Sequence, residues 1–250
     1  MDKIKFLTAT EIKFIAMALM LLDHTWALLF SGCLWLDYIG RLAFPLFAFG
    51  IVEGYKHTSS FKRYAFRLLI FALVSEIPFN LMYNSSLIYP FHQNVIFTLL
   101  FGLLIIKFID NIKIQYKDHN WKKIIKNVLG IIGTSLLSVV SFCDYGFLGV
   151  LMIVCLYLFS DSKLLQLISM IIINCMFFKG MFIPITIGNF TFEFVSQGFA
   201  VLSLPIMWLY NGKKTRKRAS QKTNKIVQYG SYIFYPAHML ILYLLTTVIL

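Results

Sequence analysis

Residues 92–110 read HQNVIFTLLFGLLIIKFID, a largely apolar stretch that is long enough to cross a lipid bilayer as a single helix. Similar stretches recur along the 250 residues, of which 59% are hydrophobic and only 14% are charged. Soluble domains carry about 25% charged residues. The composition therefore predicts a membrane protein, and it excludes a disordered chain, a secreted disulfide scaffold and a nucleic-acid-binding domain.

The apolar stretches predict an all-α, polytopic transmembrane helical bundle of about nine spans, with eight or ten also compatible with the pattern. The expected spans are residues 11–30, 38–55, 63–82, 92–110, 122–141, 145–160, 164–179, 193–210 and 228–249. The sixth and seventh are short, and one of them fits a tilted or re-entrant segment. No long linker divides the sequence, so residues 1–250 are expected to form a single domain.

The basic residues predict the orientation in the cell membrane. Most of the 23 Lys and Arg residues gather at the N-terminus and in the connections near 56–67, 107–126 and 211–226. Because short cytoplasmic loops carry the excess of positive charge, the N-terminus and the 211–226 loop are expected to be cytoplasmic. With nine spans, the C-terminus is then extracytoplasmic. A cleaved signal peptide is disfavoured, since Asp23 and His24 interrupt the first apolar run.

The cysteines and other metal-binding residue types predict no metal site. Cys33, Cys143, Cys155 and Cys175 have no spacing typical of metal ligands or of a disulfide framework. They are interpreted as small apolar side chains.

Ionisable residues inside the predicted spans are the candidates for chemistry. A charged side chain at the centre of a span costs about 2.5 to 3.5 kcal/mol, so each one indicates a partner or a function. These residues are Asp23, His24, Arg41, Glu53, Glu76 and His238. Apart from Glu53, which is expected near the inner rim, these residues and Asp144 are expected to converge on a polar cavity in the outer half of the bilayer. The alternatives are a structural Asp23–His24 pair, and a His238 ring that binds a carbonyl freed by Pro236.

Helical spacing connects the first span to an anionic ligand. Lys13 and His24 are eleven residues apart, which puts them on one helix face about 16 Å apart. That separation is similar to an extended pantetheine arm, so coenzyme A phosphates near Lys13 would bring a thioester close to His24. Basic residues at the same rim form a further anion dock, or else they anchor helix ends at the membrane surface.

Several segments, taken together, resemble the TraX family of integral membrane acetylases. The resemblance covers most of the chain, and it depends on the order and spacing of the segments because no single one is specific. The segments are Lys13–Met17 leading to Asp23–His24, Gly40–Phe49, Glu53–Tyr55, His57–Thr58, Tyr64, Arg67, Pro78–Phe79, Asn94–Val95, Thr98, Asp144–Gly146 and Tyr235–His238.

The resemblance implies acetyl transfer from cytosolic acetyl-CoA, the donor substrate, to an acceptor at the outer side of the membrane. That acceptor is either the amine of a pilin-like peptide N-terminus or a hydroxyl of a cell-surface glycan. Related membrane acyltransferases have an arginine and a histidine separated by ten residues, and the histidine is thought to be catalytic. In this sequence Lys13 stands in place of the arginine, and His24 matches the histidine. The implied catalytic residues are His24, Asp23 and His238; the acceptor-binding residues are Arg41, Glu76, Asp144 and Tyr145; the donor-binding residues are Lys13, Lys56, His57, Arg63 and Arg67.

Two other functions remain compatible with these residues. Intramembrane Asp, Glu and His also suit a proton-coupled secondary transporter, although the sequence shows no internal repeat. A noncatalytic assembly factor would tolerate replacement of Asp23, His24 and His238. The sequence leaves open the choice between direct transfer and an acetyl-histidine intermediate, and it leaves open the oligomeric state.

Overall fold

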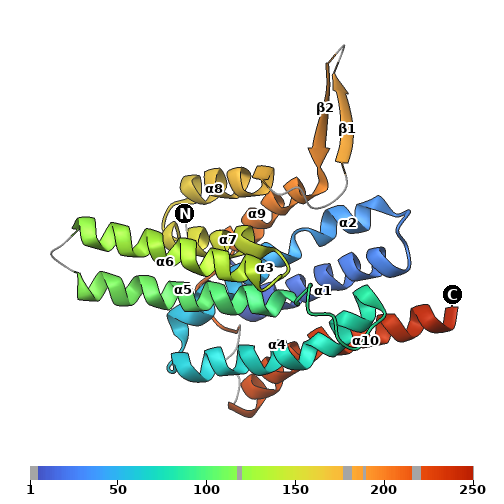
Figure 1. Ribbon diagram of the computed structural model, residues 1–250, viewed down its shortest axis with the longest axis horizontal. Helices are drawn as coiled ribbons and strands as arrows, with labels where there is room; N and C mark the ends of the chain where they lie inside the picture. The colour runs from blue at the N-terminus through green and yellow to red at the C-terminus, as the bar shows by residue number, and fades with distance from the viewer. Residues whose placement is uncertain (1–4, 117–119, 177–181, 188–189, 216–220, 250) are drawn as a thin grey trace. The chain divides into compact units, whose positions relative to one another are not determined.

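The computed structural model describes residues 5–116, 120–176, 182–187, 190–215 and 221–249, and the chain divides into two compact units. The first unit is Met1–Gly50 with Asp161–Leu250, and the second is Ile51–Ser160. One helix, α3 (Ala43–His57), contains the boundary between them (Figure 1).

Helices make up most of both units. The first unit also contains α1 (Ala9–Leu28), α2 (Leu34–Gly40), α8 (Lys163–Met176), β1 (Phe182–Ile187), β2 (Phe190–Val195), the 3₁₀ helix η2 (Ser196–Leu202), α9 (Ser203–Trp208) and α10 (Gln221–Ile249). The second contains α4 (Phe61–Asn84), α5 (Val95–Gln115), α6 (Asn120–Val140) and α7 (Gly146–Leu158).

The predicted class, an all-α membrane bundle, is confirmed. Among the described residues, five helical segments are long and apolar enough to cross a membrane: Leu34–His57, Phe61–Asn84, Val95–Gln115, Asn120–Val140 and Val227–Val248. Two shorter apolar helices are Gly146–Leu158 and Lys163–Met176. The helix α1 has 20 residues, enough to span about 30 Å, but it carries Glu11, Lys13 and Asp23.

The start of α1 is fixed by its own sequence and by a distant loop. Thr8 and Glu11 form a capping box, in which the Thr8 hydroxyl accepts from the Glu11 amide and the Glu11 carboxylate accepts from the Thr8 amide. The next helical amides, Ala9 and Thr10, donate to the carbonyls of Lys213 and Lys214 at 2.9 and 3.1 Å. The chain just before α10 thereby satisfies the first orphan donors of α1.

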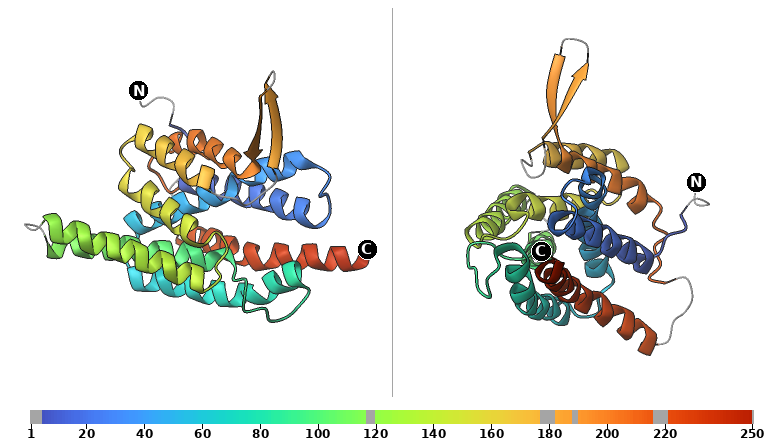
Figure 2. Two further views of the ribbon diagram at one scale, coloured as in Figure 1. Left: turned by 45° about the horizontal axis from the view of Figure 1, so that its top comes forward. Right: turned by 90° about the vertical axis from the view of Figure 1, so that its right-hand side faces the viewer.

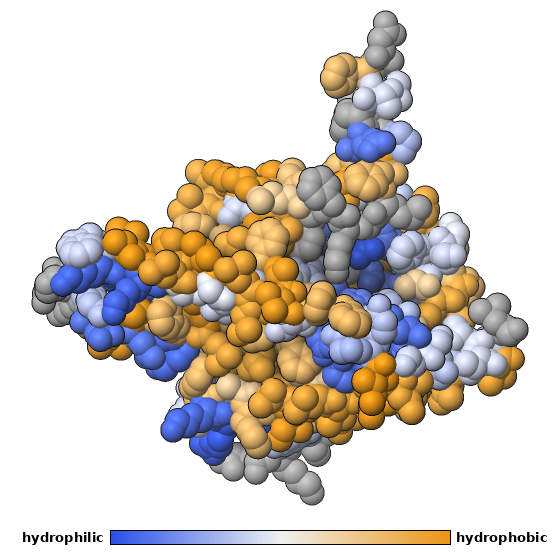
Figure 3. All heavy atoms as spheres, in the orientation of Figure 1, coloured by the Kyte–Doolittle hydropathy of each residue, from blue (hydrophilic) through white to orange (hydrophobic). Residues whose placement is uncertain are grey.

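In the second unit, α5 packs against α4, α6 and α7 around a core that contains Ile105, Ile109, Val150 and Val154. The outward side of α6 is apolar, as expected for contact with lipid, whereas the end where α5 stops and α6 begins is hydrophilic (Figure 3). That end belongs to the basic connection near 107–126, which the sequence predicts to be cytoplasmic; the orientation itself stays a prediction.

Two predicted spans differ from the structure. Residues 193–210 were expected to form one span, which is wrong: β2 continues to Val195 and is followed by η2 and the six-residue α9. The strands β1 and β2 form an antiparallel hairpin that projects from the helices of its unit (Figure 1). The span expected at 38–55 begins earlier, at Leu34, and is broken between Gly40 and Ala43. Residues 177–179 of the seventh expected span and 216–220 of the expected cytoplasmic loop lie outside the described residues.

Candidate active site

A pair of buried histidines connects α1 to α10. The Nδ1 atom of His24 lies 2.7 Å from Nε2 of His238, and both rings are more than nine-tenths buried. The ring centroids are 4.9 Å apart and the ring planes differ by 12°. Since two nitrogens approach to 2.7 Å, the nearly coplanar rings meet edge to edge, in the geometry of a hydrogen bond.

The two helices that carry this pair run parallel and side by side (Figure 2). One contact joins the first part of α1 to the middle of α10, where Lys13 Nζ donates to Ser231 Oγ at 3.4 Å. The other lies further along, where His24 meets His238. Lys13 and His24 therefore both face α10, so the shared helix face predicted from their spacing is confirmed.

The ring of His238 has a second partner on its own helix. Its Nδ1 lies 2.7 Å from the backbone carbonyl oxygen of Phe234, one turn earlier in α10. The carbonyl that Pro236 deprives of its helical donor belongs to Tyr232, four residues before the proline. The ring does bond to a backbone carbonyl close to Pro236, but that of Phe234, so the predicted alternative of a ring that satisfies a freed carbonyl stays open.

Asp23 points to a different helix from His24. Its carboxylate lies 3.9 Å from Arg41, whose guanidinium also pairs with Asp37, a fully buried carboxylate one turn earlier in α2. Close packing holds this group together, because a Cβ atom on Gly40 would come within 2.5 Å of Asp23 Cβ. Two carboxylates thus share one cation, and the triad has a formal charge of −1 beside the histidine pair.

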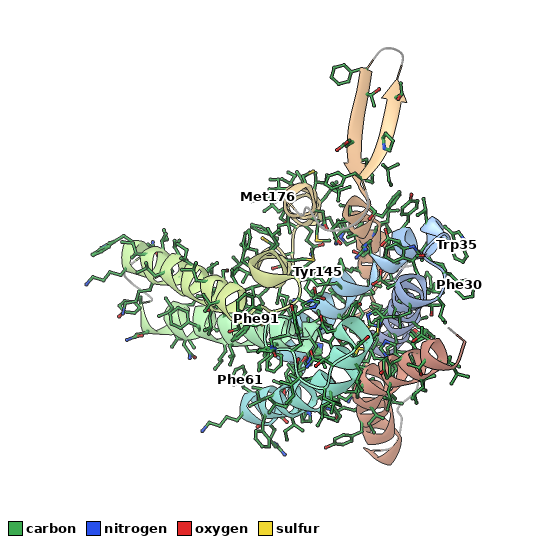
Figure 4. All side chains as sticks on the ribbon, turned by 45° about the vertical axis from the view of Figure 1, so that its right-hand side comes forward. Phe30, Trp35, Phe61, Phe91, Tyr145 and Met176 are labelled. Carbon is green, nitrogen blue, oxygen red and sulfur yellow. The ribbon has the colours of Figure 1, made fainter. Side chains whose placement is uncertain are left out.

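The turn between α1 and α2 carries exposed aromatic side chains. Phe30 and Trp35 flank it, are more than half exposed, and point away from the two helices (Figure 4). Tryptophan side chains such as Trp35 are typical of the membrane–water interface. Such a position would place the turn at one membrane surface, a turn and a half of helix beyond Asp23.

Glu76, a predicted acceptor-binding residue, lies in the second unit and contacts the beginning of α5. Its carboxylate accepts from the backbone amide of Asn94 at 2.9 Å and from the Asn94 side-chain amide. Asn94 in turn caps α5, since its side-chain oxygen accepts from the Ile96 amide at 3.0 Å. These bonds give Glu76 a local role in the start of a helix.

Asp144 and Tyr145 lie at the turn between α6 and α7. The Asp144 carboxylate accepts from the Tyr145 amide at 3.0 Å and pairs with His92 at 3.8 Å, while Thr98 donates to the Asp144 carbonyl. Tyr145 has a positive φ of 63° where α7 begins (Figure 4). In the same turn, burial raises the pKa of the Cys143 thiol to about 12, and the neighbouring carboxylates reinforce that shift.

The remaining predicted donor-binding residues also lie in the second unit, at the end of α3 and the beginning of α4. Lys56 and His57 are exposed, and Lys56 pairs with Glu53 at 3.2 Å. Arg63 is exposed, and the Arg67 guanidinium lies 5.7 Å from the Tyr64 ring centroid. The Lys and Arg side chains at these two adjoining helix ends fit the chemistry of a phosphate ligand.

Sequence reasoning missed two groups of polar residues. Asp37 lies just before the expected second span, and its only signal was the four-residue spacing to Arg41. In the second unit, Asp110 accepts from the hydroxyl of Tyr55 at 2.7 Å and from that of Tyr157, with Lys113 Nζ 3.6 Å away. Its signal was a carboxylate at the end of the apolar 92–110 stretch.

The structure thus brings together four predicted residues of the first unit, as the pairs His24–His238 and Asp23–Arg41. Glu53, Glu76 and Asp144 belong to the second unit. The expected convergence of Glu76 and Asp144 with the four residues of the first unit on one cavity therefore stays a prediction.

Long apolar helices with a buried, hydrogen-bonded histidine pair define the class: a helical membrane protein with a candidate active site between α1 and α10. Residues 8–246 match the TraX protein family, so the chain belongs to that family and the predicted resemblance is confirmed. The chain is also 26% identical, over 249 residues that cover 94% of each chain, to the probable fimbrial assembly protein FimC of Dichelobacter nodosus. No solved structure matches it.

Proposed function

We propose that this protein is a membrane-embedded acetyltransferase that moves an acetyl group from acetyl-CoA to the amine of a peptide N-terminus. The observation that carries the proposal is the buried His24–His238 pair, which sets a basic imidazole among apolar helices. Imidazole is the side chain most often used to move a proton during acyl transfer. Membership of the TraX family supports the reaction class.

The proposed reaction forms one bond and breaks one. The acceptor nitrogen attacks the carbonyl carbon of the thioester, and the carbon–sulfur bond breaks as the thiolate leaves. His24 takes the proton that the nitrogen loses, then returns it to the thiolate, so the enzyme ends in its starting state. An acetyl-histidine intermediate on His24 reaches the same products in two steps.

Two observations favour a peptide amine as the acceptor: the name of a related protein and the charge of the Asp23–Arg41–Asp37 triad. The Dichelobacter nodosus protein carries the name of a fimbrial assembly protein, which favours a fimbrial or pilus subunit as the acceptor. The triad of Asp23, Arg41 and Asp37 has a net negative charge next to His24 in sequence, which favours an amine over a neutral hydroxyl. We therefore propose N-acetylation over O-acetylation of a glycan.

The residues proposed to bind the donor have basic side chains. Lys13 begins the face of α1 that ends at His24. Lys56, His57, Arg63 and Arg67 offer donors suited to the phosphates of coenzyme A, and in this proposal they lower the KM for the donor rather than act on the reacting atoms.

A direct assay tests the function. Purified protein in detergent is incubated with acetyl-CoA and a synthetic peptide whose N-terminus is free; a peptide blocked at its N-terminus and a glycan serve as matched acceptors. Free thiol and the mass of each acceptor are followed. Thiol release and a mass gain that need the free amine are expected. Mass gain only on the glycan would overturn N-acetylation, and no thiol release with any acceptor would overturn the enzyme. Proton uptake by proteoliposomes would then support the transporter.

A further inference from the structure

The two hydrogen bonds of His238 determine where protons lie in the buried pair. A backbone carbonyl oxygen has no hydrogen to give, so the contact between Phe234 O and His238 Nδ1 requires a hydrogen on Nδ1. A neutral imidazole carries a hydrogen on one nitrogen only. The Nε2 atom of His238 is then an acceptor.

The same logic extends across to α1. Because His238 Nε2 accepts, the atom 2.7 Å away, His24 Nδ1, must donate. Neutral His24 therefore has its hydrogen on Nδ1 and its basic lone pair on Nε2. The order of the chain is Phe234 carbonyl, His238, His24, with each ring donating through Nδ1.

We infer that His238 is a positioning residue that holds His24 in the Nδ1–H tautomer, so that Nε2 of His24 is the atom that accepts the acceptor's proton. This replaces the catalytic role expected for His238 from sequence. It resembles in logic the carboxylate that fixes the tautomer of a catalytic histidine, with a second imidazole and a backbone carbonyl in its place.

Three features of the structure favour this role over a simple link between helices. The two rings are nearly coplanar, which aims the His238 lone pair along the ring plane of His24. The ring of Phe234 lies parallel to that of His238, with centroids 4.8 Å apart, and fixes the orientation of the latter. The pair is buried, so water does not compete for either nitrogen. A single orientation and a single proton arrangement follow.

Ring nitrogens can be observed without any activity. Protein labelled with ¹⁵N-histidine is studied by long-range proton–nitrogen correlation NMR, and the His24 signals are assigned by their loss in His24→Phe. We expect a protonated Nδ1 and an unprotonated Nε2 for His24. In His238→Phe, which keeps a ring of similar size but removes the acceptor, the His24 hydrogen should leave Nδ1. In His238→Gln, whose side-chain oxygen accepts, it should return there.

Kinetics provide the second readout, and this part alone rests on the proposed function. His238→Phe should lower kcat by about 10² to 10⁴, as expected for a catalytic histidine in the wrong tautomer, while the KM for acetyl-CoA stays unchanged. His238→Gln should recover part of that loss. Thermal unfolding of each variant shows that it is folded.

The outcomes separate the two proposals. A protonated Nε2 on His24 of the wild type, or a tautomer that is the same in His238→Phe, would overturn the positioning role whatever the activity. The expected tautomer in a protein that transfers no acetyl group would overturn the proposed function and leave the proton arrangement intact. A folded His238→Phe variant with wild-type kcat would overturn the link between tautomer and rate.

Discussion

The histidine pair of the first unit and the Asp110 group of the second are both polar clusters among apolar helices, but their donors and acceptors balance differently. Asp110 only accepts, and two tyrosine hydroxyls and Lys113 supply its donors. In the proposed arrangement of the histidine pair, each ring donates one hydrogen through Nδ1, and Nε2 of His24 is the basic nitrogen. Their position among apolar helices does not distinguish the two clusters. The number of hydrogen-bond donors relative to acceptors does: it separates the histidine pair, which suits proton transfer, from the Asp110 group, which holds helices together.

Removal of the base tests the reactive side of this comparison. In His24→Ala, the rate of acetyl transfer should fall by about 10² to 10⁴, because no group remains to take the proton. His24→Gln should not restore it, since an amide does not accept that proton. Free-thiol release measures the rate. Asp161→Ala, at an exposed aspartate that the proposed mechanism does not use, is the control and should keep the wild-type rate.

An active, folded His24→Ala protein would contradict the mechanism. The comparison itself would also fail, because a histidine pair that is dispensable for rate would be another structural contact.

Thiol labelling tests how closed the Asp144 turn of the second unit is. The raised pKa of Cys143, about 12, leaves it protonated at neutral pH, with roughly a thousandfold less thiolate than a thiol of pKa 9.0. A variant that keeps only Cys143 should react very slowly with maleimide at pH 7, whereas one that keeps only Cys33, which is exposed, should react readily.

The same two variants report the orientation. An impermeant maleimide added to intact cells should label Cys33, which the predicted topology places outside. Fast labelling of Cys143 in folded protein would contradict the burial that the structure gives this turn.

Loss of the Asp110 carboxylate tests the structural side. Asp110→Ala leaves two tyrosine hydroxyls without their acceptor, so the free energy of unfolding should fall by about 1 to 3 kcal/mol. Thermal unfolding in detergent, followed by tryptophan fluorescence, measures the change. Asp161→Ala, at an exposed aspartate, should leave the melting temperature unaltered. A loss of kcat at full stability would instead make Asp110 part of the chemistry.

Charge removal at the beginning of α4 should have the smallest effect. The double variant Arg63→Gln, Arg67→Gln should raise the KM for acetyl-CoA about two- to thirtyfold, the range for two exposed ion pairs, with kcat unchanged. Lys62→Gln, at an exposed neighbour, is the control and should change neither constant. An unaltered KM in the double variant would assign these arginines to lipid headgroups.

The positions of the helices in this protein can be predicted from the apolar runs. The reason is that a segment inside a membrane must satisfy its backbone hydrogen bonds internally, as a helix does. The α4, α5, α6 and α7 segments were predicted within a few residues for that reason. The hairpin was not, although two runs rich in β-branched and aromatic residues flank Gly188–Asn189, a typical hairpin signal. The apolar run of its second strand was instead assigned to a membrane helix.

The sequence could predict which residues belong to the candidate site, but not how they pair. The free-energy cost of burying an ionisable side chain in a membrane identifies His24, His238, Asp23 and Arg41 as candidates. It does not predict which helix faces pack against each other. Hydropathy alone leaves α1 free to pack against any other span. The choice of α10 as the partner depends on packing between residues 214 positions apart, which no local pattern encodes.

The hydrogen bonds between α1 and residues 213–214 make the start of the first helix dependent on a segment that lies 204 residues later in the chain. During translation, α1 with Lys13, Asp23 and His24 leaves the ribosome before α10 has been made. Its first backbone amides therefore have no carbonyl partners until the chain has grown by about 200 further residues. The buried pair therefore forms only after His238 has been added to the chain. A chain that stops before His238 would therefore lack the partner ring of His24, although α1 to α9 would be complete.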